Sequence, residues 1–304
     1  MKKYLALLLI LLVPLLTHCA VVENGGGGFL SGGGFGHTNV SRSPAIINVS
    51  GWDPKEVQRA GDRYTQNDLS ALRRNGAVAF IARSAKGPLL DEKFSSFLKS
   101  ADRQSFLLGA YHFVTLDQSP AAQADSFVAR VRAIARAQGI TQRKILLVGD
   151  FDTNSTPDRL AAFISRVHQL TGVYPVTYLE NSDALRARLS TATSVQKSII
   201  SQSPYWLALY SPKGTERTIA TTGNVPLTPD TLAALYGIWP TWSMWQYGGV
   251  TWENGGSRAK HYNTNEWSSP AYFGNMSHPM ERSVFKGNYE DLRSFWDRHS
   301  MTLF

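Results

Sequence analysis

Two carboxylates follow an apolar run in the stretch KILLVGDFDTN, residues 144–154. The run from Ile145 to Val148 predicts a buried strand that leads directly into Asp150 and Asp152. Strand side chains alternate, so these acids face the same side, roughly 6–7 Å apart along the strand. Such a pair suits glycoside hydrolysis, in which one acid protonates the leaving oxygen and the other supports a cationic sugar or activates water. Their proximity raises the pKa of one of them.

Two other interpretations of this acid pair stay open. One acid could cap the following helix while the other lies solvated in a loop. A D-x-D pair also occurs at metal sites, but here no His cluster with ligand spacing accompanies it. We therefore predict no metal and no organic cofactor.

Other predicted strand ends carry polar and aromatic residues. Sugar rings stack on aromatic faces, while polar groups fix the hydroxyls, so these residues are candidates for substrate binding. Any single aromatic among them could instead belong to the core. The candidates are Arg83 in FIARSAKG, Tyr111 in GAYHF, Tyr178 in VTYLE, Tyr210 in WLALY, and Trp245 and Gln246 in MWQYG.

Alternating strands and helices must position these residues. The apolar runs predict strands near residues 44–50, 77–85, 106–114, 144–152, 174–180, 205–211 and 241–248. The sequence also predicts helices near residues 65–76, 89–105, 119–139, 156–172 and 181–190. Start and stop residues mark the helices at 65–76, 119–139 and 156–172. Five strand–helix units followed by strands predict an α/β fold with a parallel, TIM-like barrel that loses its helices late. Reactive residues in such barrels lie at the C-terminal strand ends, where Asp150 and Asp152 fall.

The N-terminal segment predicts export. Residues 1–18 combine two lysines with an apolar run that is too short for a good spanning helix, as in a signal peptide. Cys19 follows in LTHC, which resembles a bacterial lipoprotein signal, and we predict lipidation there; the alternative is plain secretion. Residues 19–44 include a Gly-rich tether, and residues 45–304 form the barrel domain. This organisation predicts a protein held at the cell envelope or secreted.

Composition limits the partners. The net charge is +8. Removing residues 1–18 takes away two of the 31 basic residues and none of the 23 acidic ones, which leaves a charge of +6. A basic exported protein suits an anionic cell wall. A nucleic-acid partner is not expected, because no basic–aromatic motif is present. Cys19 is the only cysteine, so the barrel domain has no disulfide.

Several motifs, in order, resemble family 25 glycoside hydrolases, the muramidases of the Chalaropsis lysozyme type. INVSGW resembles the family's opening I-D-V-S-x-W, and FIARSAKGPLLDEKF resembles its F-x-x-x-R-A-S-x-G segment with D-x-x-F. LLGAYHF with Gln123, LLVGDFD, SMWQYG and MERSVFKGNYEDLRSFW follow in the family order. The resemblance runs from about residue 46 to about residue 296 and implies a (β/α)5(β)3 barrel.

The resemblance also implies a site with altered acids. The family's first-strand Asp corresponds to Asn48, its D-x-E to Asp150 and Asp152, and its last Asp to Glu281. A second alignment would place Asn263 at the last position. Glu180, which has the strand parity of Tyr178, is a further candidate carboxylate, although a solvated loop acid is the expected alternative.

The predicted function is therefore peptidoglycan hydrolysis. The resemblance implies cleavage of the β-1,4 bond between N-acetylmuramic acid and N-acetylglucosamine in glycan strands. Asp152 is the predicted general acid, with Asp150 and Glu281 as its partners and Asn48 among the substrate-binding residues. The rival interpretation is a peptidoglycan-binding lipoprotein that uses the same barrel and cuts slowly or not at all.

Overall fold

The computed structural model describes residues 37–51, 53, 64–151, 155–211, 222–230, 236–248 and 281–304. The predicted signal segment, Cys19, Asp152 and Asn263 lie outside these residues.

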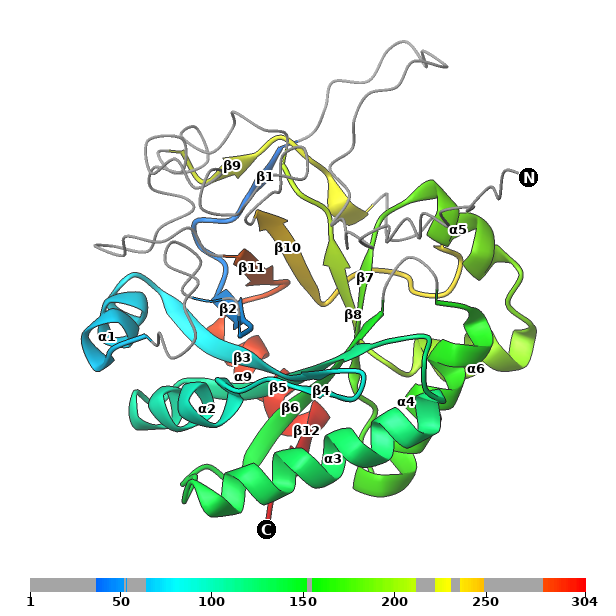
Figure 1. Cartoon of the computed structure of the whole chain (residues 1–304). Coiled ribbons are helices and arrows are strands. Elements are labelled where there is room, and N and C mark those ends of the chain that lie inside the picture. The colour runs from blue at the N-terminus through cyan, green and yellow to red at the C-terminus, as the bar shows by residue number, and fades with distance from the viewer. Residues whose placement is uncertain are drawn as a thin grey trace, which may run out of the picture.

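Eight strands close into a barrel (Figure 1). Around the barrel the order is β2–β3–β5–β6–β7–β8–β10–β11, and β11 pairs with β2 to complete the circle. The strands are β2 (Ala45–Val49), β3 (Ala77–Lys86), β5 (Leu107–Val114), β6 (Lys144–Phe151), β7 (Val176–Glu180), β8 (Tyr205–Ala208), β10 (Met244–Gly248) and β11 (Glu281–Phe285).

Strand direction separates β11 from the other seven barrel strands. β2, β3, β5, β6, β7, β8 and β10 run parallel to their neighbours in this group. β11 runs antiparallel to both β10 and β2. The seven parallel strands have their C-terminal ends at one rim of the barrel. Because β11 runs in the opposite direction, its first residue lies at that same rim. We call this rim the mouth.

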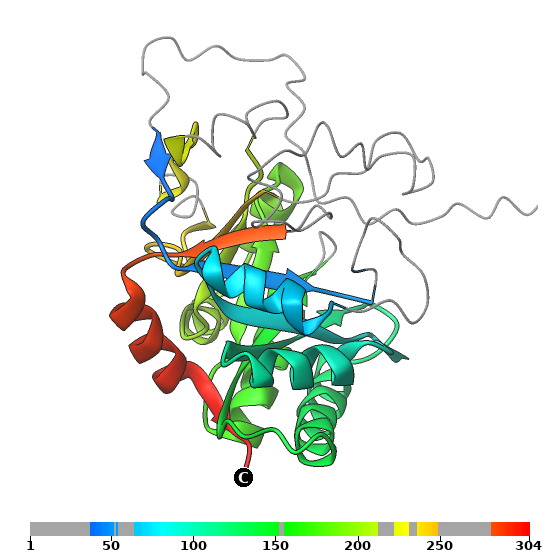
Figure 2. The ribbon, with the colours of Figure 1, turned by 90° about the vertical axis from the view of Figure 1, so that its left-hand side faces the viewer.

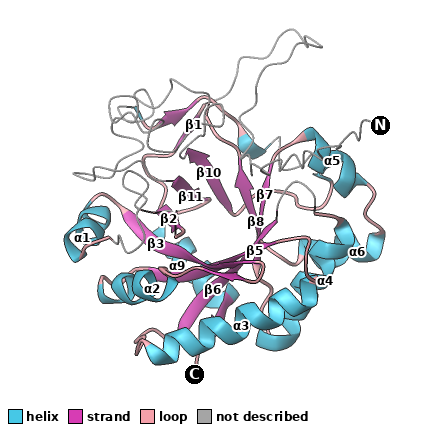
Figure 3. Ribbon diagram, viewed as in Figure 1, coloured by secondary structure: helices cyan, strands magenta, loops and turns pink. Residues whose placement is uncertain are grey.

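Helices follow the first five barrel strands and cover the outside of the barrel (Figures 1 and 3). The order of five strand–helix units and then three strands confirms the predicted (β/α)5(β)3 architecture. The helices are α1 (Gln66–Arg74), α2 (Phe94–Arg103), α3 (Pro120–Ala137), α4 (Pro157–Thr171), α5 (Asp183–Ser190), α6 (Ser194–Ser201) and α9 (Tyr289–His299). None of the helices in the described ranges is long and apolar enough to cross a bilayer.

Local sequence chemistry accounts for most helix ends. Thr65, Ser119 and Thr156 cap α1, α3 and α4 by accepting hydrogen bonds from backbone N–H groups of the first turn. Gly172 ends α4 at φ +76°, a left-handed conformation that glycine adopts without steric cost.

Two apolar clusters lie on the two faces of the barrel wall, as strand alternation requires. The inner cluster fills the barrel, and the outer cluster lies between the strands and their helices. The inner cluster comprises Ile46, Ala79, Ile81, Leu146, Val148, Val176, Trp206, Met244, Phe285, Leu292, Phe295 and Trp296. The wall therefore has a defined inner face, and its polar residues toward the mouth can form a site.

Helix α9 closes the end of the barrel opposite the mouth. It follows β11 along the chain (Figure 2). It contributes Leu292, Phe295 and Trp296 to the inner cluster. The indole Nε1 of Trp296 donates to the carbonyl of Leu108, near the start of β5, at 2.8 Å. Strand β12 (Ser300–Thr302) then pairs antiparallel with the start of β6.

The structure differs from the predicted elements in three places. α2 begins at Phe94, because Leu89–Leu90 form a short strand, β4, that folds back on β3. α6 and α9 were not among the predicted helices. Within the predicted tether, β1 (Thr38–Asn39) pairs with β9 (Asn224–Val225).

Candidate active site

Asp150 lies at the mouth end of β6, beside Tyr178 of β7. Leu146 and Val148, on the same side of the strand, belong to the inner cluster. Strand alternation therefore directs Asp150 toward the inside of the barrel. The structure thus places one of the two predicted acids at the mouth, and the position of Asp152 stays a prediction.

Glu281 is the first residue of β11 and lies opposite Asn48 of β2. The side-chain amide Nδ2 of Asn48 donates a short hydrogen bond to Glu281 Oε2. Ser283 and Phe285 continue the same face into the barrel, where Ser283 Oγ accepts a hydrogen bond from Trp206 and Phe285 joins the inner cluster. The resemblance mapped two altered positions to residues 48 and 281, and the structure brings these two side chains into contact.

Asn48 and Glu281 belong to a longer hydrogen-bonded line. The hydroxyl of Tyr178 donates to Gln246 Oε1 at 2.5 Å. Gln246 Nε2 in turn donates to Asn48 Oδ1 at 3.0 Å. Three residues predicted to bind substrate therefore contact one another, across β7, β10 and β2, and the line ends at a carboxylate of β11.

Asp150 and Glu281 lie on opposite sides of the barrel, because β6 and β11 are four strands apart in either direction around it. The charges of both acids affect the pKa of Tyr111 of β5. Burial raises the pKa of Tyr111 well above its usual range, the nearby Arg83 guanidinium opposes this shift, and the charges of Glu281 and Asp150 add to it. The carboxylate of Asp53 raises the pKa of Tyr111 as well, so Tyr111 lies in an acidic part of the mouth.

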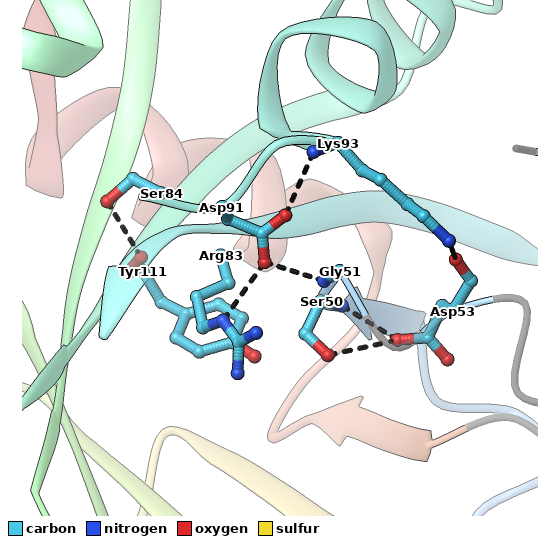
Figure 4. Close-up of polar contacts among 8 residues, drawn as sticks. All are labelled: Ser50, Gly51, Asp53, Arg83, Ser84, Asp91, Lys93 and Tyr111. Carbon is cyan, nitrogen blue, oxygen red and sulfur yellow. Dashed lines mark hydrogen bonds and ion pairs between the residues drawn. The ribbon is translucent and has the colours of Figure 1, made fainter. Parts of the chain in front are cut away.

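Arg83 is held beside Tyr111 by a buried acid, Asp91 (Figure 4). Arg83 Nε donates to Asp91 Oδ2 at 3.0 Å, and the Asp91 side chain is 1% exposed. The same carboxylate accepts the backbone N–H of Gly51 at 2.6 Å and that of Lys93 at 3.0 Å. A Cβ at position 51 would lie 2.9 Å from Asp91 Oδ1, so glycine permits this approach.

Asp91 thereby joins β3, the segment after β2 and the start of α2. That segment is tied a second time, because the buried ammonium of Lys93 donates to the Asp53 carbonyl at 2.6 Å. The Asp53 carboxylate accepts the backbone N–H of Ser50 at 2.7 Å (Figure 4). These contacts fix the rim of the mouth next to Asn48 and Arg83.

Trp245 does not line the mouth, which corrects its assignment as a substrate-binding residue. It is fully buried in the outer cluster, and its indole donates to the Leu209 carbonyl at 2.9 Å. Gln246 faces the barrel interior, so its strand neighbour must face outward. Tyr210 follows β8 and is partly buried.

Glu180, offered as a substitute carboxylate or a solvated loop acid, is neither exposed nor in a loop. It is the last residue of β7 and 8% exposed. Burial is the main cause that raises the pKa values of Tyr205 and Tyr236, two phenols of the outer cluster. The charge of Glu180 also raises these pKa values, by less. Its electrostatic partners therefore include side chains of the outer cluster.

Sequence reasoning missed the supporting roles of Asp53, Asp91 and Lys93. Asp91 appeared only as the acid of the D-x-x-F resemblance. Lys93 has no local signal, since a lysine at the start of a helix is normally solvated. Their function depends on contacts about 40 positions away in the chain, from Gly51 to Asp91 and from Asp53 to Lys93. Within the described ranges, no group of three or more His, Cys, Asp or Glu residues could hold a metal ion.

Solved structures with a similar fold were found at low sequence identity. The chain superimposes on a bacterial lysozyme from Streptomyces coelicolor with a TM-score of 0.54, 18% identity, and coverage of 84% of this chain and 97% of that one. A muramidase from Acremonium alcalophilum gives a TM-score of 0.51, 19% identity and coverage of 83% and 98%. A family 25 glycosyl hydrolase from Bacillus anthracis gives a TM-score of 0.51 and 16% identity, with coverage of 86% of this chain and 97% of that one.

The comparison with curated proteins found no match. The sequence does match the profile of glycosyl hydrolases family 25 over residues 62–255, a range that includes Asp150 and Asp152. Asn48 and Glu281 lie outside that range, and the barrel places them at the same mouth as Asp150. Because the matched range covers more than half of the sequence and the barrel has the same fold, the chain belongs to glycosyl hydrolases family 25.

Proposed function

We propose that the protein is a peptidoglycan hydrolase that cleaves the β-1,4 bond between N-acetylmuramic acid and N-acetylglucosamine. Family membership supports glycoside hydrolysis. The observation that carries the proposal is that Asp150 and Glu281 lie at the mouth on opposite sides of the barrel, each on the inward-facing side of its strand. Two carboxylates from opposite sides of a barrel can flank a sugar ring and support a positive charge that develops on it.

In this proposal Asp152 is the general acid that protonates the leaving oxygen. Asp150 and Glu281 stabilise the oxocarbenium charge. If the substrate's N-acetyl group assists as nucleophile, its N–H needs an acceptor to orient it. Asp150 suits this role better than Asn48, because the Asn48 carbonyl already accepts from Gln246.

The length of the general acid limits the rate. An aspartate where the family carries glutamate moves the proton by about 1 Å, and a displacement of that size costs about 100-fold in rate. We therefore expect slow but measurable turnover. The rival function, a barrel that binds glycan strands without cutting them, rests on the same altered acids.

Digestion of purified peptidoglycan tests the proposal. The wild type should release soluble muropeptides with new reducing ends, and Asp152→Asn should abolish the release. Asp297→Asn is the matched control, because Asp297 is exposed and its ion pair within the described residues is with the surface residue Lys144. Co-sedimentation of the wild type with peptidoglycan, without release of fragments, would favour the binding function instead.

We further propose that the protein acts in the bacterial cell envelope after export, anchored through a lipid on Cys19. The signal-like segment before Cys19 and the Gly-rich stretch after it support this proposal. Fractionation of cells that express the full chain would test it. Cys19→Ser should move the protein from the membrane fraction to the soluble exported fraction, and an unchanged distribution would contradict anchoring.

A further inference from the structure

The line of hydrogen bonds from Tyr178 to Glu281 has a single direction. Each donor points toward β11: the Tyr178 hydroxyl to Gln246, the Gln246 amide to Asn48, and the Asn48 amide to Glu281. An amide has one donating and one accepting end, so turning either amide around would place two donors or two acceptors face to face. The direction of the line is therefore set by its carboxylate end, because a carboxylate only accepts hydrogen bonds, whereas a phenol hydroxyl can donate or accept.

Burial makes this direction costly to disturb. Gln246 is 1% exposed and Asn48 is 8% exposed. Buried polar groups that lose their partners cost about 1–3 kcal/mol each, and chains of buried hydrogen bonds polarise one another. A glutamate has one more rotatable bond than an aspartate, so an unrestrained Glu281 carboxylate would move more. The contact with Asn48 restrains it at the mouth.

Asn48 also determines how much charge this side of the barrel carries. An aspartate at position 48 would put a second carboxylate against Glu281, and two carboxylates in contact cannot both ionise freely. One of them would retain a proton, which could reside on either side chain. With asparagine at position 48, the pair carries one negative charge, and it belongs to Glu281.

We propose that Tyr178, Gln246 and Asn48 are positioning residues that fix a single negative charge on Glu281, across the barrel from Asp150, rather than residues that contact substrate. This proposal rests on the proposed function for its catalytic consequence. Its structural part is independent of that function.

A charge-swapped double variant, Asn48→Asp/Glu281→Gln, separates the location of the charge from its amount. The amide introduced at position 281 can donate to the carboxylate introduced at position 48, and Gln246 can still donate to that carboxylate. Every partner in the line remains satisfied, but the charge moves from β11 to β2. We expect urea-denaturation stability at pH 7 close to that of the wild type and a kcat on peptidoglycan that is at least 100-fold lower with a similar KM. Full retention of kcat would overturn the proposal.

The single variant Asn48→Asp tests the contact without any substrate. Two touching carboxylates raise the folded-state pKa of one of them above its unfolded value. The variant is therefore expected to be as stable as the wild type near pH 4 and to lose stability relative to it as the pH rises to 7. An identical pH dependence of urea denaturation in the two proteins would overturn the proposed contact, even if the wild type proved to have no hydrolytic activity.

Tyr178→Phe tests the donating end of the line. The phenylalanine removes only the hydroxyl. It keeps the ring, which packs edge-on against Trp206 with 5.1 Å between the ring centroids. If Tyr178 positions Glu281 through the two amides, kcat should fall about threefold to tenfold while KM stays unchanged. A rise in KM with unchanged kcat would mean that the hydroxyl binds substrate, and it would overturn the positioning role.

Discussion

A single carboxylate, Asp91, organises one side of the mouth. Its side chain is almost entirely buried and accepts hydrogen bonds from Arg83, from the segment after β2 and from the residue that caps the N-terminus of α2. Removing one partner of a buried ion pair leaves an uncompensated charge, which costs much more than the pair itself contributes. The stability of this rim therefore depends on one residue that contacts no substrate in our proposal.

We predict that Asp91→Asn lowers the free energy of unfolding by about 3 kcal/mol, because an amide cannot accept all of these donors and leaves Arg83 without its counter-charge. Urea denaturation at pH 7 would measure the loss. The matched control is Asp125→Asn, which breaks the half-exposed ion pair with Arg166 and should cost less than about 1 kcal/mol. Equal losses in the two variants would contradict the role of burial.

His112 makes stability depend on pH. Burial lowers its pKa to about 4, and the hydrogen bond with Gln123 only partly opposes that shift. The folded protein thus holds the imidazole neutral, whereas the unfolded chain takes up a proton below a pKa of about 6.5. The contribution of His112 is complete above that pH, decreases as the pH falls toward 4, and levels off below it.

His112→Gln keeps a donor for Gln123 and removes the titration. Between pH 7 and pH 4, the wild type should lose about 2–3 kcal/mol more unfolding free energy than this variant. Urea denaturation at both pH values would show the difference. Parallel losses in the two proteins would mean that His112 is not the group responsible.

At the scale of the elements, helix α9 closes the barrel and was missed in the sequence. Its apolar residues are few. Its start carries a capping box formed by Asn288 and Asp291, and this pair of residues could have indicated the start of a helix in the sequence. α6 buries only Ile200, so periodicity could not reveal it. Caps and periodicity agree in α1 and α4, which were predicted, whereas α2 was predicted although it has no side-chain cap.

The contribution of α9 to the free energy of unfolding can be measured at Trp296. Trp296→Phe should lower the free energy of unfolding by about 2 kcal/mol, because it shrinks the inner cluster and leaves the Leu108 carbonyl without its donor. Chemical denaturation would measure the change. Phe304→Ala, at a half-exposed position of the same C-terminal region, should cost less than about 0.5 kcal/mol. A similar effect of the two changes would argue against closure by α9.

At the scale of the whole molecule, barrel closure determines which distant residues meet. The barrel and the mouth position of Asp150 could be predicted from the sequence, because they depend on local patterns and motif order. The Tyr178–Gln246–Asn48 line could not, because it joins strands that are adjacent only after the barrel closes. Trp245 was misassigned because its strand parity was not considered.

The positive charge of the whole chain leads to a prediction about binding. The chain has a net charge of +8, or +6 without residues 1–18, so an anionic cell wall should attract it, and salt should screen that attraction. Co-sedimentation of Asp152→Asn with purified peptidoglycan, which avoids digestion, should weaken severalfold between about 50 and about 500 mM NaCl. Binding that is independent of salt would assign recognition to the barrel mouth alone.

The side-chain alternation of β11 sets the electrical sign of the mouth. Glu281 shares the inward face of Ser283 and Phe285, and it pairs with Asn48 in regular register. The guanidinium of Arg282 therefore lies on the outer face, 5.9 Å from the Tyr247 ring centroid. Sliding β11 by one residue would exchange their faces. A guanidinium would then occupy the place of the carboxylate. The mouth would repel the positive charge that, in our proposal, develops on the sugar ring.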